Sequence, residues 1–266
     1  MGNEIVATLW IGPELRWLEQ LSLSSFIRQG HRVKLYAYNM VEGLPFGVEL
    51  ADATTIWNPP RAFLDSSGPA LIADIFRLHL MKKTDEIWVD SDMVAIAPFT
   101  RSSDGYAVGF EATGKVVNNA VLRLPPDSPA LNALLHFVDN PTPPDWLRRV
   151  HRKTIANTPP DARLQLMHKI RRASMGPMAL SHMIKSHGEM DQILPRDTYY
   201  PVPWPFTDVL FSPHGGVEGW LSPQTQGIHL WSNLIRAHHK KNLPDSRSFI
   251  GRLYKSHADE FKARAA

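Results

Sequence analysis

The amino-acid sequence predicts a single α/β domain in which helices flank a mixed sheet. A strand, a helix and a second strand follow one another at the start of the chain, and a long helix later leads into a short apolar strand. The 266 residues, 43% hydrophobic and 9% aromatic, are also enough to close one core and exclude wholesale disorder.

The first three elements are predicted from local patterns. Residues 5–11 form an apolar run that Gly12-Pro13 closes, which is typical of a buried strand. Residues 14–29 place apolar side chains at helical spacing before Gly30, and residues 32–38 alternate as in a strand. In such a sheet, ligands bind beyond the carboxyl ends of the strands. Those ends carry Trp10, Ile11, Tyr36 and Tyr38.

The remaining elements are predicted in the same way. A helix over 69–83 precedes an apolar strand over 86–89, which ends in Asp90-Ser91-Asp92. Further on we expect a strand over 117–122, helices over 128–138 and 178–186, an irregular loop over 199–220 and a strand over 227–230.

The Asp90-Ser91-Asp92 turn is the most informative segment. Two carboxylates that follow a buried strand can converge on one divalent cation, and hard oxygen ligands suit Mg²⁺ or Mn²⁺. Asp and Ser are also common in solvated turns, so a structural role is the first alternative. A second alternative is the nucleophile loop of haloacid-dehalogenase-like phosphatases, in which Asp90 would attack phosphate. That loop usually lies near the N-terminus, and a later paired-aspartate motif is missing here.

Several segments in order resemble the DXD-motif glycosyltransferases of the GT-A fold, of the family 32 type and its capsule and lipopolysaccharide relatives. The segments span roughly residues 5 to 235: Leu9–Gly12, Ala73–Arg77, Ile87–Asp92 with Pro98-Phe99, Asn118–Leu122, Gly176-Pro177 and His229–Trp231. Two features depart from the family. Lys83-Thr84-Asp85 stands where relatives often have Gly-Gly, and the basic stretch 148–172 has no counterpart.

The resemblance implies a GT-A-like domain over 1–266 that moves a hexose from a nucleotide sugar, UDP- or GDP-linked, to a glycan or lipid-linked acceptor. It implies that Asp90 and Asp92 hold a divalent metal that neutralises the diphosphate leaving group, with His229 as third ligand. Asp74 and Arg77 would then contact the donor sugar or its phosphate. Retention of anomeric configuration and a role in surface polysaccharide or lipopolysaccharide synthesis are likewise expectations from the family.

Other candidate residues have a structural reading beside the functional one. Asp74 and Arg77 share a helix face and could form a local ion pair. Trp10, Ile11 and Tyr36 could bind the nucleotide or pack in the core. Ser91, Asn118 and Asn119 could bond sugar hydroxyls or satisfy turns. A non-catalytic sugar- or nucleotide-binding module is the third hypothesis for the whole chain.

The net charge of +3 conceals segregated charge. A basic segment over 145–172 has, between Arg148 and Arg172, eight Lys or Arg against Asp161, and a basic tail over 236–266 has eight against three acids. Such segments suit anionic lipid headgroups or the phosphates of a lipid-linked acceptor. Leu164, Leu166, Met167 and Ile170 give the first an amphipathic character, although a solvated helix face is equally expected. Few aromatics interleave with the cations, so no nucleic-acid partner is expected.

Several classes are excluded or disfavoured. The absence of cysteine excludes a disulfide scaffold, a thiol nucleophile and a zinc-thiolate site. The N-terminus lacks a signal-peptide pattern, and Val6 stands where myristoylation needs Ser or Thr. We therefore expect a cytoplasmic protein, peripheral at the inner face of the membrane if it contacts lipid.

Overall fold

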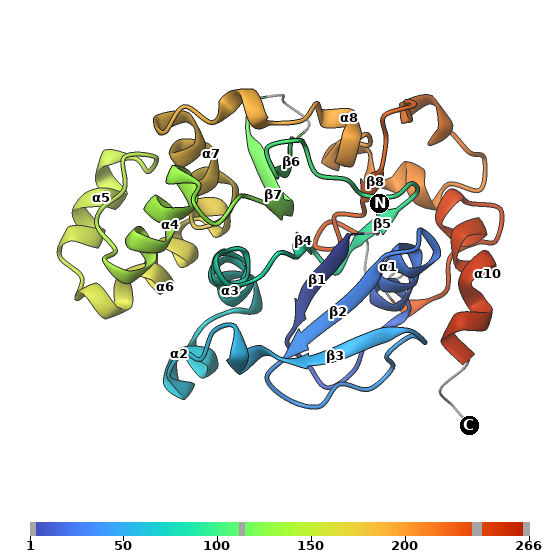
Figure 1. Cartoon of the computed structure of the whole chain (residues 1–266), viewed down its shortest axis with the longest axis horizontal. Helices are drawn as coiled ribbons and strands as arrows, with labels where there is room; N and C mark the ends of the chain where they lie inside the picture. Colours follow the sequence, from blue (N-terminus) through green and yellow to red (C-terminus); the bar gives the residue numbers. More distant parts are fainter. Residues whose placement is uncertain (1–3, 112–114, 236–240, 263–266) are drawn as a thin grey trace.

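The computed structural model describes residues 4–111, 115–235 and 241–262 (Figure 1). Its strands and helices are, in chain order, β1 Ile5–Trp10, α1 Trp17–Arg28, β2 Arg32–Ala37, β3 Val48–Asp52, α2 Arg61–Ser66, α3 Pro69–Lys83, β4 Ile87–Val89, β5 Met93–Ala95, β6 Ala107–Phe110, β7 Val117–Arg123, α4 Pro129–Asp139, α5 Arg149–Ala156, α6 Arg163–Ile170, α7 Pro177–Ser186, α8 Arg196–Tyr199, β8 Gly227–His229 and α10 Phe249–Lys262.

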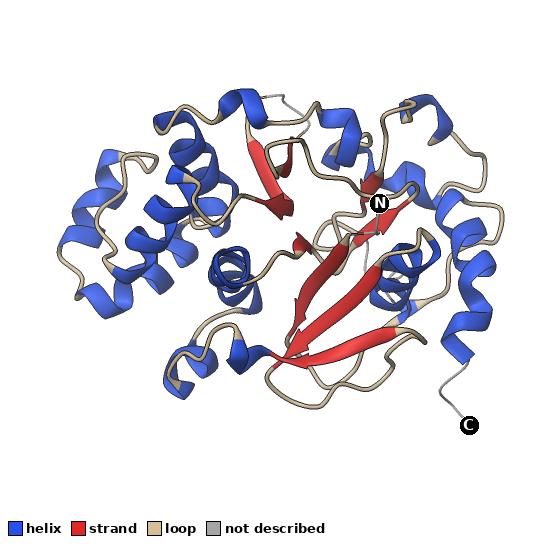
Figure 2. Cartoon of the chain, viewed as in Figure 1, coloured by secondary structure: helices blue, strands red, loops and turns tan. Residues whose placement is uncertain are grey.

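Six strands form one mixed sheet in the order β3-β2-β1-β4-β7-β6. The pairs β3-β2, β2-β1 and β1-β4 are parallel, whereas β7 runs antiparallel to both β4 and β6. A second sheet of two strands pairs β5 with β8. Helices lie around the main sheet (Figure 2), so the predicted α/β class with a mixed, helix-flanked sheet is confirmed. The arrangement agrees with a GT-A-like fold.

The two faces of the sheet are covered by different helices because strand side chains alternate. On one face Val33 and Leu35 of β2 pack with Leu23 and Phe26 of α1. On the other face, β1 and β2 side chains pack against α3, and α4 and α7 extend the same core. The helix predicted over 69–83 has those bounds in the structure, with Pro69 at its first turn.

Some elements were not predicted. The strands β3, β5 and β6 have three to five residues, too few for their patterns to stand out. The predicted loop over 199–220 contains two segments of 3-10 helix, Trp204–Phe211 and Glu218–Trp220. Helix α2, before α3, has only six residues, and none of them is buried. It therefore shows no apolar periodicity from which it could be predicted.

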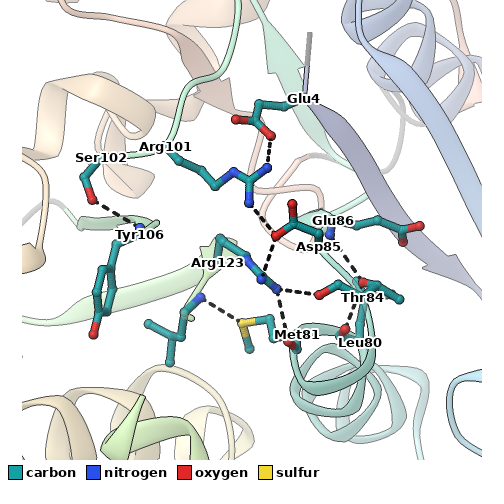
Figure 3. Close-up of polar contacts among 11 residues, drawn as sticks. Glu4, Leu80, Met81, Thr84, Asp85, Glu86, Arg101, Ser102, Tyr106 and Arg123 are labelled. Carbon is teal, nitrogen blue, oxygen red and sulfur yellow. Dashed lines mark hydrogen bonds and ion pairs between the residues drawn. The ribbon is translucent and has the colours of Figure 1, made fainter. Parts of the chain in front are cut away.

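An ion-pair network fixes the start of β4 (Figure 3). The Arg123 guanidinium, which is 3% exposed, donates to the carbonyls of Met81 at 3.0 Å and Thr84 at 2.9 Å, and to Asp85 at 3.0 Å. Arg101 also reaches Asp85, at 2.6 Å, and donates to Glu4. Thr84 and Asp85 thus link the end of α3 to β7 and, through Arg101, to Glu4 before β1.

The basic segment folds into α5 and α6, separated by a 3-10 turn at Pro160–Ala162. These helices gather with α4 and α7 at one end of the molecule (Figure 1). Leu164 and Met167 are buried with Leu71 and Ile75 of α3, and Leu166 and Ile170 pack against the same cluster. The apolar side of α6 therefore faces the protein, so the amphipathic interpretation of this segment as a membrane face is not supported by its packing.

The predicted C-terminal tail contains helix α10, which the sequence pattern did not indicate. Ile250 is fully buried, and the rings of Tyr254 and Trp17 of α1 meet edge to face at 5.8 Å. Arg252 pairs with Glu218 at 2.6 Å. Residues 236–240 and 263–266 of the predicted tail lie outside the described residues. Among the helices that the structure describes, none combines the length and apolar character needed to span a bilayer.

Candidate functional site

The Asp90-Ser91-Asp92 loop joins strands of different sheets. The chain leaves the main sheet at the end of β4 and enters the small sheet at β5, so the two carboxylates lie where the sheets separate. The Asp90 amide donates to the Ala120 carbonyl of β7 at 2.7 Å, and the Asp90 carbonyl accepts from Met93 at 3.0 Å. Ser91 is half-buried between the two carboxylates.

His229 reaches this loop because β8 pairs antiparallel with β5, which places Met93 opposite His229. The His229 Nε2 atom lies 3.2 Å from Asp92 Oδ1. The backbone amide of Ser232 donates to Asp92 Oδ2 at 2.7 Å, and Trp231 between them adopts a φ of 54°. A left-handed backbone is uncommon for a bulky residue, so the chain is held tightly around Asp92.

Asp90, Asp92 and His229 form a candidate metal centre. One donor atom from each lies within 4.8 Å of the others. Opposite ligands of Mg²⁺, at bonds of about 2.1 Å, are separated by about 4.2 Å, so this donor set fits a small divalent cation after minor adjustment. His229 Nδ1 is buried without a hydrogen-bond partner among the described residues. Two carboxylates and an imidazole suit Mn²⁺ or Mg²⁺.

The protonation of the buried Asp92 and His229 pair follows from opposing effects. Burial raises the pKa of Asp92, but the His229 charge and hydrogen bonds from His229 and Ser232 outweigh it and hold the pKa below its usual value. For His229, burial lowers the pKa, but the attraction of Asp92 and, further off, Asp90 and Glu111 raises it overall. The carboxylate and imidazole thus favour each other's charged forms.

Asp74 and Arg77 of α3 join the loop through a second set of contacts. Arg77 Nη1 lies 3.0 Å from Asp90 Oδ1, and Arg77 Nη2 lies 3.3 Å from Asp74 Oδ1. The guanidinium also stacks 4.5 Å above the Trp88 ring, whose Nε1 donates to Asp90 at 2.8 Å. Because Arg77 is only 4% exposed, it is a fixed link between the helix and the loop.

Asn119 of β7 completes this group. Its side-chain amide donates to Asp74 Oδ1 at 2.8 Å, and its carbonyl accepts from Arg77. Burial raises the pKa of Asp74 to about 6, although Arg77 and the Asn119 hydrogen bond oppose the increase. A Cβ at Gly176, the N-cap of α7, would lie 2.8 Å from Asn119 Nδ2 and 2.9 Å from Asp74 Oδ1. The backbone of Gly176 therefore forms a wall of the site.

Asn118 and Glu111 form a neighbouring polar pair. Asn118 donates to Glu111 Oε2 at 3.2 Å and accepts from the Ala120 amide at 2.8 Å. Burial raises the pKa of Glu111, while Asn118 and His229 oppose the increase. Glu111 was not predicted from sequence, because it follows β6, a strand that was itself not predicted. A carboxylate directly after a short apolar run was the available signal.

The three residues proposed for the nucleotide lie in different environments. Trp10 ends β1, where it pairs with Ala37 of β2 and packs against the core, and its Nε1 is buried without a partner among the described residues. Ile11 follows it and is 37% exposed. Tyr36 is buried and donates its hydroxyl to Glu86, so the structure does not bring it into the group around Asp90. Tyr38 is half-buried against the core and donates its hydroxyl to the Trp57 carbonyl.

The chain is similar in structure, but not in sequence, to known proteins. No family model matches the chain, and no curated protein matches its sequence. Among solved structures, the chain is similar to the PaToxG glycosyltransferase, with a TM-score of 0.41 and 13% sequence identity. The alignment covers 72% of this chain and 78% of that one. The function is therefore argued from the residues of the site.

Proposed function

We propose that this chain is a metal-dependent glycosyltransferase that moves a hexose from a UDP- or GDP-linked donor to a glycan or lipid-linked acceptor. One observation carries the proposal. Asp90, Asp92 and His229 supply a donor set for a divalent cation, and Arg77 connects the same loop to Asp74. A candidate cation site thus adjoins buried polar groups that could hold a sugar.

In this proposal, the loop after β4 and the strand β8 together supply the metal ligands. Asp90, Asp92 and His229 would hold Mn²⁺ or Mg²⁺. The cation, when bound, supplies positive charge that stabilises the diphosphate leaving group. The Ser232 amide and the β5-β8 pairing fix the orientation of Asp92 and His229 before any ligand binds.

The second group of residues would orient the donor. Asp74 as a carboxylate accepts hydrogen bonds from sugar hydroxyls, and Asn118, Asn119 and Ser91 offer further hydrogen-bonding groups. Arg77 forms ion pairs with both Asp74 and Asp90 and would place its positive charge beside the phosphates. The Trp10 ring and the Ile11 backbone, at the end of β1, would contact the base. We assign Tyr36 to the core instead.

The reaction and its setting are proposed from the family resemblance. The transfer would retain the anomeric configuration and contribute to surface polysaccharide or lipopolysaccharide synthesis. Peripheral contact with the inner face of a membrane remains part of the proposal. The phosphatase alternative would use Asp90 as nucleophile, but the sequence lacks the later paired-aspartate motif that would complete its metal site. We therefore do not favour it.

The proposal is tested by thermal stabilisation with a panel of UDP- and GDP-hexoses, with and without Mn²⁺. A ligand at 100 times its Kd stabilises the folded state by about 2.7 kcal/mol, which is readily measured. We expect one donor to stabilise the protein only with the cation, and Asp92→Asn to lose that stabilisation. Asp65→Asn, on the exposed side of α2, is the matched control. Full metal-dependent stabilisation in Asp92→Asn would contradict the metal assignment.

Two further measurements separate the alternatives. Release of UDP or GDP from the stabilising donor distinguishes an enzyme from a binding module, which would bind without release. Release of phosphate from p-nitrophenyl phosphate that is lost in Asp90→Asn would instead support the phosphatase.

A further inference from the structure

A basic hollow lies at the helical end of the molecule, apart from the metal centre. It has a volume of about 370 Å³, which is in the range of small-ligand sites, and is lined by Trp146, Leu147, Arg148, His151, Ile170, Arg171 and Met178. We call it the Arg148 pocket. Its residues come from the loop before α5, α5, the end of α6 and the start of α7.

The lining combines two chemistries. Arg148 and Arg171 are exposed, and among the described residues neither guanidinium forms an ion pair. The nearby Asp145 carboxylate is taken by Arg152 at 2.5 Å. Trp146, Leu147, Ile170 and Met178 supply apolar surface, and none of the described residues that line the hollow carries a carboxylate. Guanidinium groups suit phosphate oxygens through paired hydrogen bonds, while the apolar side chains suit a hydrocarbon.

The pocket is close to the donor site. Met178 lines the pocket, whereas Gly176, two residues earlier, presses against Asp74 and Asn119. Two residues span at most about 7 Å. The apolar cluster under α5 and α6 also contains Leu71 and Ile75, which flank Asp74 on α3. A ligand anchored in the pocket could therefore extend a hydroxyl group toward the proposed sugar site.

We propose that the Arg148 pocket binds a phosphate group carried on an apolar chain. Its assignment to the acceptor of glycosyl transfer rests on the proposed function, but the binding itself does not. The phosphate could belong to a lipid-linked acceptor or to a bilayer headgroup, and the experiment separates these sources.

The first experiment measures binding of monomeric decyl phosphate by calorimetry to the wild-type chain and to two double variants with the same change in charge. Arg148→Ala with Arg171→Ala removes the pocket cations. Arg149→Ala with Arg172→Ala removes the exposed arginines next to them, which do not line the pocket. We expect the Kd to rise at least tenfold in the first variant and less than twofold in the second.

Several results would overturn the proposal. These are absence of binding by the wild type, equal weakening in both variants, equal affinity for neutral decyl maltoside, or displacement of decyl phosphate by UDP at similar concentration. A thermal melt of each variant shows whether it folds, and Arg148→Lys with Arg171→Lys keeps the charge if the alanine pair does not fold. That lysine pair should bind more weakly than the wild type because it loses the paired guanidinium hydrogen bonds.

The second experiment identifies the source. If bilayer headgroups are the ligand, sedimentation with phosphatidylglycerol vesicles falls in the pocket variant and not in its control. If the ligand is a separate lipid phosphate, both variants sediment alike and only decyl phosphate binding differs. Donor stabilisation with Mn²⁺ should be unchanged in both, so failure of the donor assay in the wild type would refute the proposed function without affecting this pocket.

Discussion

The side-chain amide of Asn119 donates a 2.8 Å hydrogen bond to Asp74 Oδ1, from β7 to α3. Asn119 thereby binds the same carboxylate oxygen that faces Arg77 at 3.3 Å. A buried carboxylate with two partners is held in one orientation, because either partner alone would leave it rotational freedom. The sequence predicts that Asp74 and Arg77 share a helix face, but the orientation of Asp74 is fixed by Asn119, a residue of a strand distant in the chain.

Gly176→Ala should damage this arrangement. The added Cβ would lie 2.8 Å from Asn119 Nδ2 and 2.9 Å from Asp74 Oδ1, closer than van der Waals contact, so these side chains must shift. We expect a loss of about 1 to 3 kcal/mol in the free energy of unfolding and a weaker donor-induced thermal shift. Gly219→Ala, where a Cβ meets nothing within 4 Å, is the control and should change stability by less than about 1 kcal/mol. Equal effects would contradict the close approach.

Asp74→Asn should stabilise the protein at neutral pH and weaken donor binding. Burial raises the pKa of Asp74 from 3.8 to about 6, so its favourable contribution is complete below about pH 4 and is lost as the pH rises through 6. The neutral amide avoids that loss. The stability advantage of the variant should grow between pH 4 and pH 7.5, by about 3 kcal/mol at most. Urea unfolding at both pH values checks this, and a constant difference would contradict it.

The elements best predicted from sequence are those with long patterns. Helix α3 has the predicted bounds, and β1 and β2 begin at the predicted residues, because their apolar periodicity extends over several turns or alternations. Strand β5 could not be predicted, because three residues acquire strand geometry only through pairing with β8. The family resemblance indicated His229, but this pairing is what places it beside Asp92.

The candidate site was predictable in part for the same physical reason. Carboxylates after an apolar strand are visible in sequence, whereas Glu111 depended on the unrecognised β6. Tyr36 illustrates the opposite error. Its position near a strand end suggested a ligand, but alternation along β2 directs it toward α3, where it packs against Phe76 and binds Glu86. Alternation decides which face of the sheet a strand residue occupies, but the helix that covers this face decides whether the side chain is buried in the core.

Arg123→Met should destabilise the protein much more than removal of its surface partner. The Arg123 side chain is 3% exposed and satisfies the carbonyls of Met81 and Thr84 (Figure 3). Without it these acceptors lose their partner, at a cost of about 3 kcal/mol. Asp85 is 77% exposed, so Asp85→Asn should cost less than about 1 kcal/mol. Chemical denaturation of both variants checks the difference, and a larger effect of Asp85→Asn would show that the ion pairs dominate.

Met167→Ala should reveal where the apolar side of α6 lies. Met167 is fully buried with Leu71 and Ile75, so its truncation leaves a cavity and should lower the free energy of unfolding by about 2 to 5 kcal/mol. Val150 on α5 is 64% exposed, and Val150→Ala should change it by less than about 0.5 kcal/mol. If the apolar side of α6 instead served a bilayer, Met167→Ala would weaken vesicle binding and leave stability unchanged. Unfolding and vesicle sedimentation of both variants therefore distinguish an α6 whose apolar side packs inside the protein from one whose apolar side binds a bilayer. The packing of Met167 with Leu71 and Ile75 favours the packed arrangement.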